Sequence, residues 1–244
     1  MNSIDKKVNL MIKRATRMFM LILVFYVLPV QAQVGINYDL NVEDPTAFLF
    51  TMNSYINSDE GSSGSATVIL RQNIANGVTP TTHNLAVIWP DYNSMQLDFG
   101  RNATSPAWAA FQRTLGKSSS IEGNVMFAAT GLSNGDETIV TNPNQFRRFI
   151  NFTVEPHNVA EYVETLTDLW EDCDDSVHQA LYNIYGAGEG GWTHAVVQTA
   201  PSFENLLSGQ GCDPDAVTEF YSNASNIREV KNEFIGVDMM IWQP

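Results

Sequence analysis

The stretch Gly190–Leu207, GGWTHAVVQTAPSFENLL, repeats the pattern of an earlier stretch, Val78–Met95, VTPTTHNLAVIWPDYNSM. Both place a Thr-His pair before a run of apolar and β-branched residues, and both place a proline seven residues after the histidine. An aromatic residue follows two positions later, and Met95 or Leu206 comes three positions after that. Runs rich in β-branched residues that end at a proline are typical of strands. The pattern therefore predicts a strand followed by a helix, present twice in the chain.

The repetition extends over most of the chain. An offset of 111 residues aligns Leu70 with Leu181 and His83 with His194, and the offset is 112 near Val42. Small changes of offset between ungapped matches are what loop insertions leave after a gene duplication. The sequence therefore predicts two repeats, at residues 33–130 and 146–244. They are joined by a linker at 131–145 that is rich in Gly, Asn, Asp and Thr.

Each repeat is predicted to hold the same elements in the same order. Strands are expected at 35–42, 65–74, 82–89 and 123–129, and again at 146–154, 176–185, 193–200 and 234–242. Helices are expected at 45–56 and 106–115, and at 158–170 and 215–222, with a short helical turn after each third strand and Asn158 as an N-cap. The order βαββααβ is the ferredoxin-like arrangement, in which helices cover one sheet face. Since the other face is left apolar, we expect an α+β fold in which the repeats pack sheet-to-sheet as a barrel within one chain.

With these elements placed, the chain resembles the dimeric α+β barrel superfamily, which includes the antibiotic-biosynthesis monooxygenase-like domains. The resemblance covers most of residues 34–243 and rests on element order and duplication. It implies the fold and a cleft for a small hydrophobic molecule, and it suggests a cofactor-independent monooxygenase-like activity. It carries over no catalytic residue.

Residues 1–32 have the composition of a secretory signal. An uninterrupted apolar run from Met18 to Val30 follows five basic residues, Lys6, Lys7, Lys13, Arg14 and Arg17. The run is shorter than the roughly 20 residues that span a bilayer, and the small residue Ala32 stands at the expected cleavage position. We therefore expect cleavage after Ala32 and a secreted or periplasmic protein. An uncleaved N-terminal anchor is the alternative.

Charge and cysteine content limit the partners and the compartment. Removal of the signal segment takes away five basic residues and Asp5, so the formal charge goes from −14 to −18. Such an acidic chain disfavours nucleic acid and anionic membranes, because both bind Lys and Arg. The two cysteines are Cys173 and Cys212. In an oxidising compartment we expect them to form a disulfide, with two buried thiols as the alternative.

His83 and His194 are the candidate catalytic residues, each at the start of the third strand of its repeat. Side chains alternate along a strand, so each histidine shares a face with every second residue after it. If that face looks into the barrel, the pair lines the interior, where a neutral imidazole acts as a general base. The alternative is a histidine at a strand edge that bonds a neighbouring backbone carbonyl and is retained by ancestry.

Further candidates for a ligand pocket lie near each histidine. Arg71 aligns with Tyr182 and Thr67 with His178, so one face of the second strand is polar in both repeats. Aromatic residues that flank the histidines offer a pocket wall, namely Trp89, Trp192 and Tyr92. Solvent-exposed sheet surface and core packing are the alternative explanations.

The remaining motifs do not point to a nucleotide or a metal. GAGEGG at 186–191 has the glycine spacing of a dinucleotide site, but such a site needs a helix after the glycines, and here a strand is predicted. The histidines and cysteines lack zinc-type spacing. The acidic clusters near Asp59 and Asp172 lack the calcium-loop pattern. We therefore expect no cofactor and no metal.

Two classes of function remain. The first is an exported small-molecule-binding barrel, with cofactor-independent turnover of an apolar substrate by His83 or His194. The second is a non-catalytic exported module, in which the repeats complete a stable barrel whose surface docks a partner. The first predicts a pocket of about 300 Å³ or more that touches one or both of these histidines, and the second predicts an interior filled by side chains.

Overall fold

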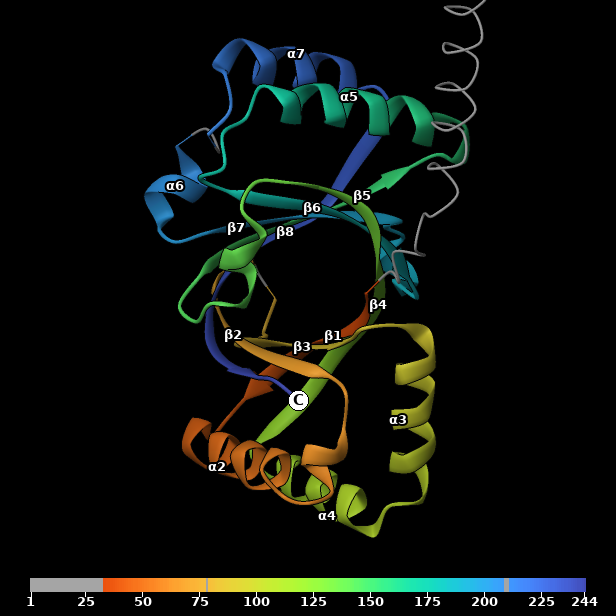
Figure 1. Cartoon of the computed structure of the whole chain (residues 1–244), viewed down its shortest axis with the longest axis vertical. Helices are drawn as coiled ribbons and strands as arrows, with labels where there is room; N and C mark the ends of the chain where they lie inside the picture. The colour runs from red at the N-terminus through yellow and green to blue at the C-terminus, as the bar shows by residue number, and fades with distance from the viewer. Residues whose placement is uncertain (1–32, 78, 209–210) are drawn as a thin grey trace, which may run out of the picture. The chain divides into compact units, whose positions relative to one another are not determined.

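Eight strands form one closed antiparallel barrel in a computed structural model that describes residues 33–244 except 78, 209 and 210 (Figure 1). The strand order is β1-β3-β2-β8-β5-β7-β6-β4. The first repeat supplies β1 (Val34–Val42), β2 (Thr67–Ala75), β3 (His83–Trp89) and β4 (Ser119–Asn134). The second supplies β5 (Phe146–Val154), β6 (His178–Tyr185), β7 (His194–Ala200) and β8 (Arg228–Trp242). The predicted α+β barrel of two ferredoxin-like repeats is confirmed. The expected signal segment, residues 1–32, lies outside the described residues.

Helices cover the outside of the barrel in two groups (Figure 1). The first repeat contributes α2 (Pro45–Ile56), α3 (Tyr92–Thr104) and α4 (Pro106–Leu115), and the second contributes α5 (Val159–Glu171), α6 (Phe203–Leu207) and α7 (Pro214–Ala224). Single 3-10 turns lie at η1 (Gly61–Ser63), η2 (Glu137–Thr141), η3 (Pro156–Asn158) and η4 (Gly188–Gly190). In the part of the chain that the structure describes, no helix is both long and apolar enough to cross a membrane.

Three details differ from the sequence prediction. α3 is a helix of 13 residues where a short turn was expected, and the Asp91 side chain caps it by accepting a hydrogen bond from the Ser94 N–H. Asn158 stands at the N-cap position of α5, but its side chain makes no capping bond, because the 3-10 turn η3 already leads into the helix. β4 and β8 begin earlier than predicted, since their first residues pair with the last residues of β1 and β5.

The hydrogen-bond register repeats the internal duplication. Gly35 on β1 lies opposite Phe127 on β4, and Arg147 on β5 lies opposite Gly236 on β8. These are equivalent positions, and each strand pair has a register shift at the equivalent place further along. The two repeats join along β2–β8 and β4–β6, which close the barrel.

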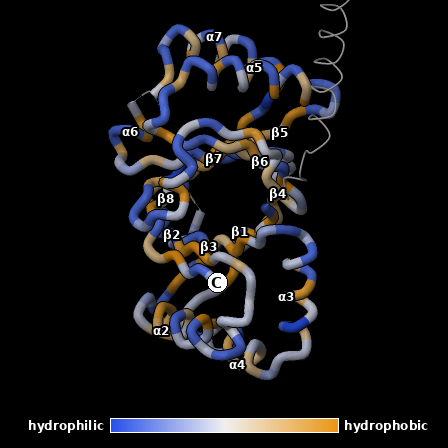
Figure 2. Tube along the Cα trace, in the orientation of Figure 1, coloured by the Kyte–Doolittle hydropathy of each residue, from blue (hydrophilic) through white to orange (hydrophobic). Residues whose placement is uncertain are grey.

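The apolar core lies between the sheet and the helices, in a separate layer for each repeat. One layer is centred on Phe48 and Leu70, and the other on Phe152 and Tyr162. Hydrophobic and hydrophilic residues alternate along α5 and α7, as expected of helices with one buried side (Figure 2). Since the helices cover only the outer face of the sheet, its inner face is left to line the barrel interior.

The disulfide predicted between Cys173 and Cys212 is confirmed. Cys173 follows the end of α5, and Cys212 precedes α7. The bond therefore joins the two helices that cover the second repeat, which also pack against each other.

Candidate functional site

The inner face of the sheet encloses a cavity of about 100 Å³, which is large enough for several water molecules or a small organic ligand. Polar and aromatic side chains share the lining. The polar ones on the strands include Asn37, Asp39, Arg71, Asn73, Asn84, Arg147, Asn151, Tyr182 and Asn232, and the other aromatic ones are Phe127, Phe149, Trp192 and Phe234. The cavity is smaller than the pocket of about 300 Å³ expected of a binding barrel and touches neither His83 nor His194, yet the interior is not the filled core that a purely structural module predicts.

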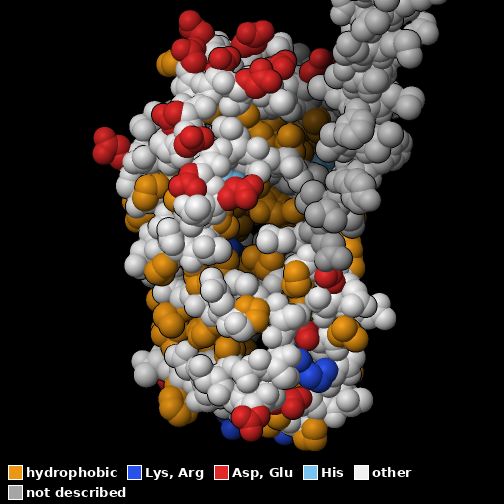
Figure 3. Space-filling view, viewed as in Figure 1, with side chains coloured by type: hydrophobic (Ala, Val, Ile, Leu, Met, Phe, Trp, Pro, Cys, Tyr) orange, Lys and Arg blue, Asp and Glu red, His pale blue; other side chains and the backbone are white. Residues whose placement is uncertain are grey.

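The two ends of the cavity are formed by different kinds of segment. Neighbouring strands are antiparallel throughout, so β2 and β6 run in the same direction, and the hairpins that follow them lie at the same end of the barrel. That end is lined by residues of these hairpins, Thr79, Thr81 and Trp192. Another part of the cavity is lined by Val140, which lies in η2 of the predicted linker. On the face seen in Figure 3, acidic side chains gather over the second-repeat helices and hydrophobic ones around the middle.

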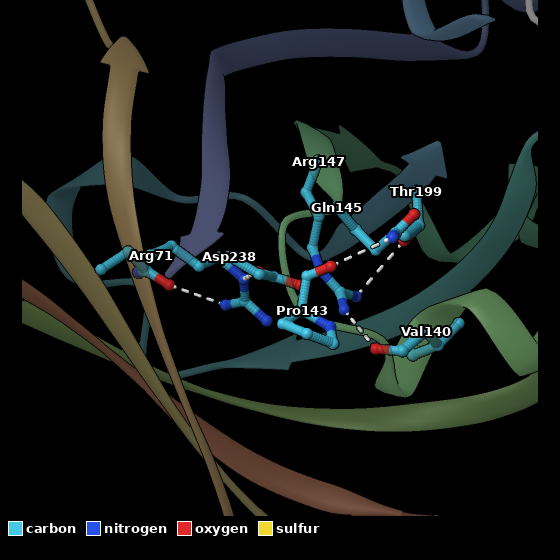
Figure 4. Close-up of polar contacts among 8 residues, drawn as sticks. Arg71, Val140, Pro143, Gln145, Arg147, Thr199 and Asp238 are labelled. Carbon is cyan, nitrogen blue, oxygen red and sulfur yellow. Dashed lines mark hydrogen bonds and ion pairs between the residues drawn. The ribbon is translucent and has the colours of Figure 1, made fainter. Parts of the chain in front are cut away.

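A buried charge cluster occupies one wall of the cavity (Figure 4). Asp238 accepts from Arg71 Nε through Oδ1 at 2.8 Å and from Arg147 Nε through Oδ2 at 2.7 Å. Arg71 Nη1 donates to Asn84 Oδ1 at 2.9 Å, and Asn84 Nδ2 donates in turn to Asp39 Oδ1 at 3.2 Å. Asp238 is fully buried, and the two arginines are 3% and 4% exposed. A charged group is stable at such depth only when it is paired and hydrogen-bonded.

Two glycines make the lining unequal in the two repeats. A Cβ on Gly35 would overlap the ring of Phe127, so the glycine leaves space for that ring. In the second repeat the glycine stands on the other strand of the pair. Arg147 on β5 takes the place of Gly35, and Gly236 on β8 takes the place of Phe127. A Cβ on Gly236 would in turn lie 3.0 Å from the Gln72 carbonyl oxygen of β2. The first repeat therefore contributes an aromatic ring at one of these two positions, and the second repeat contributes a guanidinium at the other.

Burial governs the ionisation of the groups in this wall. It lowers the pKa of Arg71 to about 10, while the charge of Asp238 acts in the opposite direction and Arg147 acts with burial. Burial also raises the pKa of Asp39, against the hydrogen bond from Asn84. The pKa of Tyr182 is raised by burial as well, against the positive charges of Arg147 and Arg71. Both guanidiniums thus act electrostatically on the Tyr182 phenol.

The structure brings together only part of the residue set predicted from the sequence. Arg71, Tyr182 and Trp192 all line the cavity. His178 is buried at the start of β6 and is not among the lining residues. Trp89 lies on the opposite face of the sheet, where its indole Nε1 donates to Asp98 Oδ2 of α3 at 2.9 Å. Trp89 therefore anchors a helix and does not form a pocket wall.

His83 and His194 also lie on the outer face of the sheet. Their strand neighbours Asn84 and Ala195 line the cavity, and the histidines themselves do not. The ring of His194 instead stacks on Phe152, within the core of the second repeat. The condition for a histidine pair inside the barrel is therefore not met, because it is the alternate residues of β3 and β7 that face inward. The catalytic role of the histidines stays a prediction that the cavity geometry does not support.

The Thr-His pair of each repeat joins the start of one strand to the end of another. Thr82 Oγ1 accepts from the Val42 N–H at 2.8 Å and lies 2.8 Å from His83 Nδ1. A hydroxyl donates one hydrogen bond and accepts two, so the Thr82 hydroxyl can bond the Val42 N–H and His83 Nδ1 at the same time. The second repeat has the same contacts, at 3.1 Å from the Val154 N–H and 2.7 Å from His194, so the motif has a structural explanation.

We expect the free energy of unfolding to fall as the pH drops below about 6.5. Burial lowers the pKa of His83, His178 and His194 in the folded protein. The unfolded chain then binds more protons than the folded one, and stability is lost from the unfolded pKa down through the folded pKa values. Urea denaturation at pH 7.5 and 5.5 measures the difference. A His83→Gln/His194→Gln variant should show a smaller difference, and an equal one would contradict the assignment.

Several residues of the wall were not anticipated from the sequence, namely Asp39, Asn84, Arg147 and Asp238. One signal was available for Asp238, which stands alone among apolar residues in FIGVDMMIW, Phe234–Trp242. A lone acid inside an apolar strand requires a buried partner. The sequence does not say which arginine supplies it, because Arg71 and Arg147 are far from Asp238 along the chain.

Known proteins match this chain through structure alone: no protein-family model and no curated protein matches the sequence. A proposed monooxygenase from Fusobacterium nucleatum has a TM-score of 0.63 and 12% identity, over 89% of this chain and 96% of its own. One from Lactobacillus acidophilus has a TM-score of 0.57 and 7% identity, over 87% and 97%. A chlorite dismutase variant from Candidatus Nitrospira defluvii gives 0.55 and 12%, over 85% and 91%. At these identities the likeness shows the fold alone, a barrel built from two ferredoxin-like halves.

A heme-binding protein from Thermus thermophilus is also among the matches, with a TM-score of 0.50 and 8% identity over 86% of this chain and 92% of its own. Among the described residues, two cavities lack the side chains that most often hold a haem. Neither the barrel cavity nor the small cavity of about 30 Å³ beneath α5 and α7 is lined by a histidine or a cysteine, the common axial ligands. In the same described part of the chain, no group of three or more His, Cys, Asp or Glu side chains is arranged to hold a metal.

Proposed function

We propose that the protein is an exported small-molecule-binding barrel that holds an aromatic ligand inside the barrel. The observation that carries the proposal is a cavity whose walls combine aromatic side chains with a few converging polar groups. This combination is typical of ligand sites in proteins. The disulfide between Cys173 and Cys212 supports the exported part of the proposal, because such bonds persist in oxidising compartments.

The binding site is tested by filling the cavity. Val197 lines the cavity, whereas Val230 on β8 is 47% exposed and lies outside it. Val197→Phe should weaken binding of a neutral aromatic probe, 1-naphthamide, at least about tenfold by occupying ligand space. Val230→Phe is the matched control and should leave the affinity unchanged. Isothermal titration calorimetry measures both, and equal affinities in the two variants would place the ligand elsewhere.

Monooxygenase-like activity is a second candidate. It is favoured by fold neighbours named as proposed monooxygenases and as an anthrone oxidase-like protein. It is also favoured by Asp39, whose carboxyl group lines the cavity and has a raised pKa, as a general base requires. Oxidation of an activated methylene to a carbonyl would take up one O₂ and release one water per turnover. Oxygen uptake with anthrone should be observed and should fall at least about tenfold in Asp39→Asn. Uptake that is absent or unchanged in the variant rejects this candidate.

A further inference from the structure

The fully buried part of the cavity wall holds two positive charges and one negative charge, and the half-buried carboxyl group of Asp39 lies nearby. Arg71 and Arg147 share the single carboxylate of Asp238. Asp39 is the one carboxyl group among the described residues that line the cavity, and it reaches Arg71 only through Asn84. The ion pairs of the wall therefore leave one guanidinium charge without a direct anionic partner. A buried charge in that state is costly, so a bound anion would be stabilised there.

One guanidinium nitrogen of this cluster has no acceptor among the described residues. Each of the three guanidinium nitrogens of Arg147 has an acceptor, in Asp238, in Thr199 and in the carbonyl of Val140. Arg71 uses Nε and Nη1 in the same way, but no described residue accepts from its Nη2. Since Arg71 lines the cavity, Nη2 is the donor available to a ligand.

Tyr182 supplies a second polar group to the same interior. It lies on the other seam between the repeats, where β6 pairs with β4. Its ring packs edge-on against Phe127 with 5.5 Å between ring centroids. The positive charges of Arg71 and Arg147 act on its phenol, and burial keeps the phenol protonated, so that it donates a hydrogen bond.

The remaining walls around these donors are aromatic. Phe149 and Phe234 stack at 4.3 Å between centroids with nearly parallel rings. The guanidinium of Arg71 lies over the Phe149 ring at 5.2 Å from its centroid, which keeps the charge next to an apolar surface. A ligand in this space contacts charged groups on one side and aromatic rings on the other sides.

We infer that the ligand of the barrel cavity is an aromatic monoanion, a carboxylate or a phenolate. Its charged oxygen accepts hydrogen bonds from Arg71 Nη2 and Tyr182, while its ring lies among Phe127, Phe149 and Phe234. The inference rests on the proposed function, since it names the ligand class of the same cavity. The acidic surface of the chain does not attract such an anion, so the selectivity arises from the interior and not from long-range steering.

The test compares two probes of the same shape, 1-naphthoate and the neutral 1-naphthamide, by calorimetry with the whole chain at pH 7. The carboxylate should bind at least about tenfold more tightly, because it gains a charge-assisted hydrogen bond in a dry site. Arg71→Gln should reduce the preference to about threefold or less. That variant leaves Asp238 paired with Arg147, so the fold should be retained, as a urea midpoint will show. Arg148→Gln, next to Arg147 on the outer face, is the control and should keep the full preference.

The outcomes separate this inference from the proposed function. Equal affinity of the two probes for the unchanged protein overturns the inference and leaves the binding barrel standing. Failure of both probes to bind rejects the proposed function itself. If Arg71→Gln does not fold, Tyr182→Phe takes its place and should lower the preference several-fold without weakening 1-naphthamide. A preference that survives the substitution of either donor in a folded variant overturns the inference.

Discussion

Asp238→Ala should lower the free energy of unfolding by about 3–5 kcal/mol. The side chain is fully buried and is the common partner of Arg71 and Arg147, which come from different repeats. Its removal leaves two guanidiniums facing each other at depth with no carboxylate between them. The fall in the free energy of unfolding should also exceed the fall that an apolar cavity of the same size causes, because the desolvation of both cations is no longer offset. Chemical denaturation monitored by circular dichroism measures it.

Glu233 provides the matched control for this prediction. It pairs with Arg148 at 2.9 Å, yet its side chain is 42% exposed. Because exposed ion pairs contribute about 0–1 kcal/mol, Glu233→Ala should change stability by no more than that. A similar loss in both variants would mean that the Asp238 cluster is as well solvated as the surface pair.

Replacement of both cysteines, Cys173→Ser with Cys212→Ser, should lower the free energy of unfolding by about 4 kcal/mol in the chain-entropy model. The two residues are separated by 39 positions, so the bond removes a large closed loop from the unfolded ensemble. In the folded protein the bond also joins the end of α5 to the loop before α7, and Gln179 Nε2 contacts both sulfurs at 3.8 Å. Urea denaturation of the variant and of the unchanged protein gives the difference.

Reduction offers an independent check of the same bond. Dithiothreitol should destabilise the unchanged protein to about the level of the double serine variant. The variant itself should not respond to the reductant. A reductant effect of the same size in the variant would show that the loss does not come from the disulfide.

Much of the fold was predictable because the duplication presents each helix and strand in two different sequences, so each prediction could be compared with a second copy. The bounds expected for Pro45–Ile56, Pro106–Leu115 and Phe146–Val154 are those observed. The prediction failed where the two copies differ. The helix α3 has 13 residues and its equivalent α6 has only five, so comparison of the repeats favoured a short turn. α3 is also mostly polar and exposes Leu97, which hides its helical periodicity.

The site was less predictable, for a physical reason. In this barrel both faces of each strand are shielded, one by helices and one by the interior, so a polar residue on a strand does not reveal which face it occupies. Alternation placed His83 and Asn84 on opposite faces but could not say which of the two points inward. The closest sequence indication was Arg71 beside Tyr182 in the aligned repeats, and both line the cavity. The ion pairs to Asp238 depend on strand pairing between repeats, which no local pattern specifies.

The Gly35–Phe127 pair of the first repeat and the equivalent Arg147–Gly236 pair of the second carry different side chains, which is possible because the two repeats belong to one chain. In a barrel made from two identical subunits, every inward-facing residue occurs twice, and the lumen has to be the same on both sides of its twofold axis. Fusion of the two halves removes that constraint. Equivalent positions of the two halves can then hold different residues. One side of the lumen carries charged side chains and another carries aromatic rings, an arrangement that a homodimer could not build. Such a polarised interior suits a guest that is itself different at its two ends.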